Sequence, residues 1–166
     1  QTADMLNLPV PKANFHTEVI QPNELQRAVV AELAERADRV RARAVDPSTD
    51  NMLRITNDGR KLALDMRLIN PLAADDPNGK VATCARNVAR IWAQTKDQRS
   101  TQLVFCDLST PNKNTPIEMQ KNAEGIYEMI PDQFTDVYND LKKKLVAEGI
   151  PEEEIAFIHD AKTEQK

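Results

Sequence analysis

The chain has 166 residues, of which 40% are hydrophobic and 29% are charged, and its formal net charge is −4. This composition is typical of a soluble globular protein and argues against disorder along the whole chain. The negative charge argues against a protein that binds nucleic acid over its entire surface, although a local basic face stays open. No apolar run approaches the roughly 20 residues that a membrane span needs, so we expect no membrane contact.

The spacing of apolar residues divides the chain into three parts. Residues 1–21 predict an extended lead that contains a half-buried strand over 15–20, where apolar and polar side chains alternate. Residues 22–78 predict a helical segment, and residues 79–166 predict an incomplete α/β domain. Helices are expected over about 22–43, 58–69, 80–95 and 133–148.

Two short apolar runs predict buried strands in the last part of the chain. The run Leu103–Cys106 ends in Asp-Leu-Ser-Thr-Pro, and the run Ile155–His159 follows the last predicted helix. The order helix, strand, long loop, helix, strand is that of a βαβ unit, which would place both strands parallel in one sheet. Because two strands are too few for such a sheet, we expect the chain to be a piece of a longer protein.

Polar residues follow the first run, where parallel sheets often bind ligands. Ser109 and Thr110 are candidates for this role, and a helix-capping turn without a ligand is the alternative. The chain has four glycines, and none forms a Gly-rich phosphate loop. No cysteine and histidine set has zinc spacing, and no serine stands in a nucleophile elbow. An autonomous enzyme is therefore not supported, and no cofactor is expected in this chain.

Cys84 and Cys106 both lie within apolar patterns. Cysteines of this kind are more often reduced core residues than halves of a disulfide. We therefore expect a reducing, cytoplasmic compartment.

A succession of short motifs resembles the start of the second RecA-like domain of superfamily-two helicases, particularly Swi/Snf-type DNA translocases. The resemblance covers most of the chain, and its fold would be a partial P-loop NTPase-like lobe of parallel strands and helices. The run that resembles helicase motif IV is Gln102–Asp107. The other motifs are Pro22-x-x-Leu25-Gln26, Arg67-Leu68-Ile69-Asn70-Pro71, Gly79-Lys80 and Ile158–Gln165.

The stretch Asn51–Asp65 resembles more narrowly the large helicase proteins, often fused to adenine-specific DNA methylases, that phages, plasmids and conjugative elements carry. That resemblance implies a bacterial cytoplasmic setting and a parent protein that uses ATP and Mg²⁺ to move on DNA. The nucleotide-gripping lysine, the magnesium-binding acidic motif and the arginine fingers of the family are not in this chain. Asp160 replaces a usual glycine, and the segment 112–133 resembles an insertion. We expect no ATP hydrolysis from this chain by itself.

The resemblance implies that the chain contributes DNA-backbone binding to a helicase or translocase and meets the first helicase lobe of the parent. Hydroxyl, imidazole, amide and cationic groups would contact phosphates, which carry no sequence information. The alternative is a protein-interaction or scaffold domain of a larger mobile-element protein. The expected DNA-contacting residues are Ser109, Thr110, His159, Lys162, Gln165, Arg54, Arg60 and Arg67.

Overall fold

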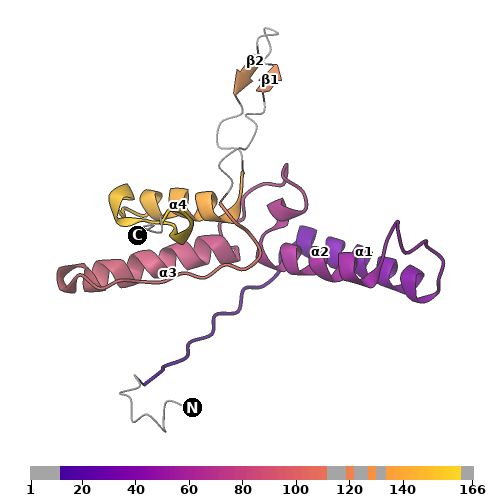
Figure 1. Ribbon diagram of the computed structural model, residues 1–166, viewed down its shortest axis with the longest axis horizontal. Helices are drawn as coiled ribbons and strands as arrows, with labels where there is room; N and C mark the ends of the chain where they lie inside the picture. Colours follow the sequence, from indigo (N-terminus) through magenta and orange to yellow (C-terminus); the bar gives the residue numbers. More distant parts are fainter. Residues whose placement is uncertain (1–11, 112–118, 122–126, 130–133, 162–166) are drawn as a thin grey trace, which may run out of the picture.

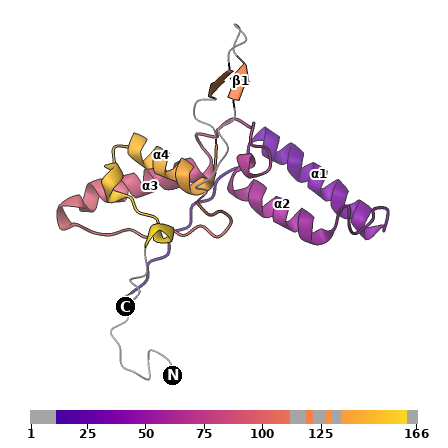
Figure 2. The ribbon, with the colours of Figure 1, turned by 45° about the horizontal axis from the view of Figure 1, so that its top comes forward.

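The computed structural model describes residues 12–111, 119–121, 127–129 and 134–161 (Figure 1). These residues form two helix pairs that lie end to end along the long axis of the molecule, α3·α4 at one end and α1·α2 at the other (Figures 1 and 2). None of the helices in this part of the chain has the length and apolar character that crossing a bilayer requires. The α-helices are α1 (Glu24–Arg41), α2 (Met52–Leu64), α3 (Lys80–Thr95) and α4 (Val137–Ala147).

The α1·α2 pair is a helical hairpin with its own apolar core. Asn23 begins α1 with a capping box, in which the Gln26 backbone N–H donates to the Asn23 side chain and the Asn23 N–H donates to the Gln26 side chain. Asn51 caps α2 in the same way, by accepting a hydrogen bond from the Arg54 N–H. The buried core of the hairpin consists of Leu33, Ala37, Ile55, Leu62 and Met66.

Arg36 fastens the loop of this hairpin to both helices. Its guanidinium donates to both carboxylate oxygens of Asp50, at 2.7 and 2.9 Å, and to Asp58 on α2 at 2.9 Å. These hydrogen bonds raise the pKa of Arg36, and the bond from Arg36 lowers the pKa of Asp50. The loop between the helices is therefore fixed by a bidentate, charge-assisted contact.

The α3·α4 pair has a separate core. Ala85 and Ala89 of α3 pack against Leu145 and Ile150 at the end of α4. Figures 1 and 2 show that α3 and α4 run in the same direction, because the extended segment 101–111 returns along α3 between them in the chain. Just past the end of α4, Gly149 turns the chain with a φ of 96°, which glycine reaches easily.

The prediction of a parallel α/β sheet of the RecA type is wrong for the described residues. The run Leu103–Cys106 is extended, but it is not paired in a ladder, and part of the run Ile155–His159 forms a 3₁₀ turn, Ile158–Asp160. The strands that do occur are β1 (Met119–Lys121) and β2 (Tyr127–Met129), and they pair antiparallel within the predicted loop. The described fold is therefore built on helices.

Among the described residues, no strand pairs with the backbone of either predicted strand. Leu103 and Phe105 are 77% and 89% exposed, although the continuous apolar run predicts burial on both faces. The predicted half-buried strand over 15–20 is likewise unpaired in the structure, and Phe15 is 94% exposed. Apolar content alone did not distinguish a buried strand from an extended segment with one bare face.

Several predicted helix boundaries also differ. The helices predicted over 22–43 and 133–148 are shorter, because Asn23 caps α1 and Asp136 caps α4. The helix predicted over 58–69 begins at Met52 and ends at Leu64. It ends there because Asp65 is extended and its carboxylate accepts from the Arg67 N–H, which starts a 3₁₀ turn over Met66–Leu68. The helix predicted over 80–95 matches α3.

The Arg36–Asp50 contact gives a pH-dependent prediction. Because the pKa of Asp50 is lowered in the folded state, its contact stabilises the fold at neutral pH and is lost as the pH falls through that lowered pKa. Asp50→Asn should therefore reduce the free energy of unfolding near neutral pH, and its difference from the parent should shrink toward about pH 3. Urea unfolding across this pH range measures the effect.

Asp38→Asn is the matched control, since Asp38 pairs with Arg41 in a contact whose side chains are 76% and 69% exposed. It should change stability much less. A stability difference for Asp50→Asn that stays constant from neutral to acidic pH would contradict this account of the Arg36 contact.

Candidate functional site

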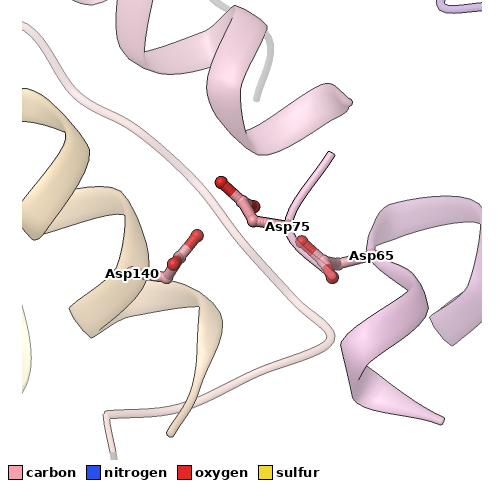
Figure 3. Close-up of side chains that lie close together, drawn as sticks. All are labelled: Asp65, Asp75 and Asp140. Carbon is pink, nitrogen blue, oxygen red and sulfur yellow. The ribbon is translucent and has the colours of Figure 1, made fainter. Parts of the chain in front are cut away.

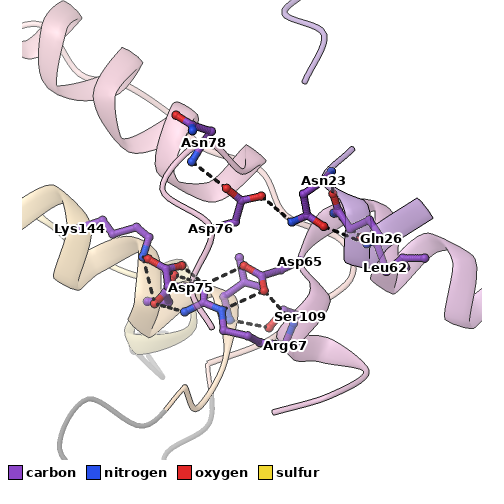
Figure 4. A network of polar contacts seen from close by, with 12 residues as sticks. Asn23, Gln26, Leu62, Asp65, Arg67, Asp75, Asp76, Asn78, Ser109 and Lys144 are labelled. Atoms are coloured by element: carbon purple, nitrogen blue, oxygen red, sulfur yellow. Dashed lines mark hydrogen bonds and ion pairs between the residues drawn. The ribbon is translucent and has the colours of Figure 1, made fainter. Parts of the chain in front are cut away.

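A buried arginine joins the two helix pairs. The Arg67 guanidinium follows α2 and donates to Asp65 at 2.7 Å, to Asp140 of α4 at 2.8 Å, and lies 2.8 Å from the Asp75 carboxylate (Figure 4). Its side chain is 7% exposed, and its other side stacks 4.3 Å from the centre of the Phe134 ring. We call Arg67, Lys144 and the three aspartates the Arg67 cluster.

The three carboxylates of the Arg67 cluster come from separate parts of the chain. Figure 3 shows Asp65, Asp75 and Asp140 pointing toward one another, and one oxygen of each lies within 4.8 Å of the others. Such a set of carboxylates could hold a metal ion, but Arg67 and Lys144 already bind these three carboxylates. The Lys144 ammonium lies 2.6 Å from Asp75 and 3.2 Å from Asp140. Two cations thus face three carboxylates, and we assign no metal to the cluster.

Arg67 stays protonated in the Arg67 cluster although its side chain is buried. Burial by itself would lower the pKa of Arg67, but the hydrogen bonds to Asp65 and Asp140 outweigh burial and raise it. Arg67 therefore stays charged, and the aspartates supply the compensation that a buried charge requires. The Arg67 cluster is a structural joint rather than a site that offers free groups to a ligand.

The ends of the two extended runs meet at the start of α4. The Tyr138 hydroxyl donates to the Cys106 carbonyl at 3.0 Å, and the Tyr138 ring meets the rings of Phe157 and His159 edge to face, at 5.6 and 5.3 Å between centroids. The Val137 N–H donates to the Ser109 hydroxyl at 3.3 Å. Ser109 and His159 are thus brought to the same end of α4. We call this the Tyr138 junction, made of Cys106, Ser109, Tyr138, Phe157 and His159.

An open hollow of about 570 Å³ lies beside the Tyr138 junction. Lys142 supplies a positive charge to its wall, and its ammonium lies 2.8 Å from Glu152. That contact lowers the pKa of Glu152. The positive charge of Lys142 in this open hollow is offset by the carboxylate of Asp160, which also lines it. Its remaining lining residues are Pro111, Asn139, Ile155, Ala156 and Phe157.

The structure brings some of the predicted DNA-contacting residues together. Ser109 is half-buried at the Tyr138 junction, Thr110 is exposed next to it in the chain, and His159 is exposed against Tyr138. Lys162 and Gln165 lie outside the described residues.

The three predicted arginines are engaged elsewhere. Arg54 is exposed on α2 and donates to the Thr49 carbonyl at 2.7 Å. Arg60 is exposed and donates to Asp107 at 3.0 Å, which ties α2 to the end of the extended run. Arg67 is buried, so we remove it from the DNA-contacting set that we consider below.

Sequence reasoning missed Tyr138 and the Arg67 cluster. Tyr138 stands on the apolar stripe of α4, so its pattern predicts a core residue, and nothing local indicates that its hydroxyl meets Cys106. Asp140 lies in the first turn of α4, where an acidic residue is favourable to the helix dipole, so its position gives no sign of a buried partner. Its distant partner Arg67 has no signal in a single sequence.

Comparison of the chain with models of protein families, with curated proteins and with solved structures finds no match.

Removing Arg67 should strongly destabilise the fold. Arg67→Ala leaves the carboxylates of the Arg67 cluster facing one another, and breaking a buried ion pair in this way costs about 3–5 kcal/mol. Arg41→Ala, which removes an exposed arginine paired with Asp38, should change stability by about 0.5 kcal/mol or less. Urea unfolding of both variants measures the difference.

Charge compensation provides the second arm of this test. In the triple variant Arg67→Met, Asp65→Asn, Asp140→Asn the uncompensated charges are gone, so a large part of the lost stability should return. Equal stability losses for Arg67→Ala and Arg41→Ala would show that Arg67 does not join the two helix pairs.

The Tyr138 junction makes a separate prediction. Tyr138→Phe removes one hydrogen bond to the Cys106 carbonyl and should reduce the free energy of unfolding by about 1 kcal/mol. The phenyl ring remains, so the NMR shifts of the His159 imidazole protons should keep their ring-current displacement. Tyr138→Ala should abolish that displacement, and unchanged His159 shifts in Tyr138→Ala would refute the junction.

Proposed function

We propose that the chain contributes DNA-backbone binding to an ATP-dependent DNA helicase or translocase, of the Swi/Snf type that its motifs resemble. ATP and Mg²⁺ would act elsewhere in the larger protein, since this sequence has no Gly-rich phosphate loop. The chain by itself would bind DNA without hydrolysing ATP.

The Tyr138 junction is the single observation that carries this proposal. It brings Ser109 and His159 to one end of α4, and Thr110 is exposed beside Ser109. Hydroxyl and imidazole groups are donors that suit phosphate oxygens, and such contacts position a protein on DNA without reading bases. Lys162 and Gln165 follow the junction closely in the sequence and remain part of the proposed set.

The charges around the junction set the expected strength of binding. Lys142 and Lys143 lie on the next turn of α4, but Asp107 and Asp160 are also exposed nearby in the chain. With so few cations in excess, the phosphates would be met by a small number of contacts. We therefore expect weak binding that depends on salt and has no base preference.

A second candidate function is that of a protein-interaction or scaffold domain. The observation that favours it is a set of exposed apolar side chains. Leu103 and Phe105 of the unpaired segment are 77% and 89% exposed, and Ile158 of the 3₁₀ turn is 81% exposed. Exposed apolar patches mark contact surfaces for other proteins. The two functions are compatible within one larger protein.

DNA binding can be tested by fluorescence anisotropy with a labelled single strand and a labelled duplex. With about two phosphate contacts, the affinity for the single strand should fall roughly tenfold or more between about 20 and about 150 mM salt. The variant Thr110→Ala, His159→Ala, Lys162→Ala should bind several-fold more weakly. Ser109 is left unchanged in it, because the Ser109 hydroxyl also accepts from the N–H that begins α4.

Arg39→Ala is the matched control, since Arg39 is an exposed cation near the far end of α1. It should bind DNA as the parent does. Affinity that is independent of salt, or an equal loss for Arg39→Ala and the triple variant, would contradict binding at the Tyr138 junction. Absence of binding at any salt would leave protein interaction as the better supported function.

A further inference from the structure

The segment 101–106, Thr-Gln-Leu-Val-Phe-Cys, runs back along α3 without forming a strand or pairing with another described segment, and a bend follows at Asp107 (Figure 1). Among the described residues, none of its backbone groups bonds to the backbone of another segment. The Cys106 carbonyl accepts a hydrogen bond from the Tyr138 hydroxyl. Backbone N–H and C=O groups left in this arrangement form a template for pairing with another strand.

The side chains of the segment alternate between two environments, as in a strand of a sheet. The Gln102 side chain donates to the Val88 carbonyl of α3 at 3.0 Å, and Gln102 and Cys106 are half-buried. Leu103 and Phe105 point the other way and are 77% and 89% exposed. Val104, on the same face as Gln102 and Cys106, is 43% exposed, so α3 covers this face only in part. The face of Leu103 and Phe105 is the more exposed of the two.

The sequence of the segment is suited to pairing with itself. It has no charge between Arg99 and Asp107, no proline and no glycine, and it contains aliphatic, β-branched and aromatic residues. Edge strands that must stay single usually have a charge, a proline or a bulge within them, and this one has none. It carries opposite charges at its two ends.

We propose that two copies of this chain associate by antiparallel pairing of their 102–106 segments about a two-fold axis at Val104. In this register Leu103 lies opposite the partner's Phe105, and the same pair is repeated across the axis. These aliphatic–aromatic cross-strand pairs would cover one another on the outer face, which is bare in the single chain. The contact uses the same patch on both copies, as a two-fold dimer requires.

The end charges favour antiparallel over parallel pairing. About an axis at Val104, Asp107 of each copy lies opposite the partner's Thr101. The partner's Arg99, in the turn just before Thr101, lies at the same end of the interface, so opposite charges rather than like charges share each end. Parallel strands would place Asp107 beside the partner's Asp107, which is destabilising. Asp107 is 83% exposed although it accepts from Arg60 through one oxygen, so its other oxygen stays accessible.

The proposal is independent of DNA binding, because its test measures mass and not affinity for DNA. Sedimentation velocity of the full chain should show a monomer–dimer equilibrium that shifts with concentration. Phe105→Lys introduces a charge at the centre of the interface and should give monomer throughout. Leu72→Lys is the matched control, since Leu72 is 85% exposed outside the segment, and it should dimerise as the parent does.

The register is tested by cross-linking in a background in which Cys84→Ala and Cys106→Ser remove the two native thiols. Leu103→Cys and Phe105→Cys chains are prepared separately and treated with an oxidant such as diamide. A covalent dimer should form when the two are mixed, because positions 103 and 105 face each other across the axis. Each variant alone should form little or none.

Three outcomes would overturn the proposal. The parent could remain monomeric at every concentration, in which case another partner or no partner occupies the segment. Phe105→Lys and Leu72→Lys could dimerise equally, which would place the interface elsewhere. Finally, Leu103→Cys could cross-link with itself as well as in the mixture, which would exclude the register about Val104.

Discussion

The buried charge of Arg67 is the constraint on which the arrangement of this protein depends. The α1·α2 and α3·α4 pairs have separate apolar cores, so burial of apolar surface stabilises each pair but does not by itself fix one against the other. The Arg67 cluster joins them, and a hydrogen bond from Asn23 to Asp76, at 2.9 Å, supports it nearby (Figure 4). A buried guanidinium tolerates few positions of its partners, so this contact specifies geometry more than it adds stability.

How far the sequence predicted the fold depended on the kind of signal. Helix α3 follows from apolar residues repeated at helical spacing, and α1 and α4 follow from similar stripes. The parallel strands failed because periodicity reports which side chains can be buried, and pairing needs a second strand that no local pattern supplies. The segment that was predicted as the first of these strands instead returns along α3 without pairing, between two helices that run the same way.

The structure places Ser109 and His159 at the same end of α4, but not as residues that follow neighbouring parallel strands. The Val137 N–H donates to the Ser109 hydroxyl, and the Tyr138 ring meets the His159 ring, while their role in DNA contact stays a prediction. The residue that joins them, Tyr138, could not be found, because a hydroxyl on an apolar stripe has the same pattern whether or not it has a partner. Arg67 was assigned to a basic surface because a single sequence does not show which cation is buried.

The charged character of the Arg67 cluster affects how the molecule responds to heat. Dehydrating charged groups becomes less costly as the temperature rises, whereas the stabilisation per unit of buried apolar area levels off. The apolar cores of the two helix pairs are small, so they are the parts that warming weakens first. The Arg67 cluster would then persist to higher temperature than the apolar cores of the two helix pairs. Thermal unfolding would begin within the pairs, and their relative orientation would be kept until late in the transition.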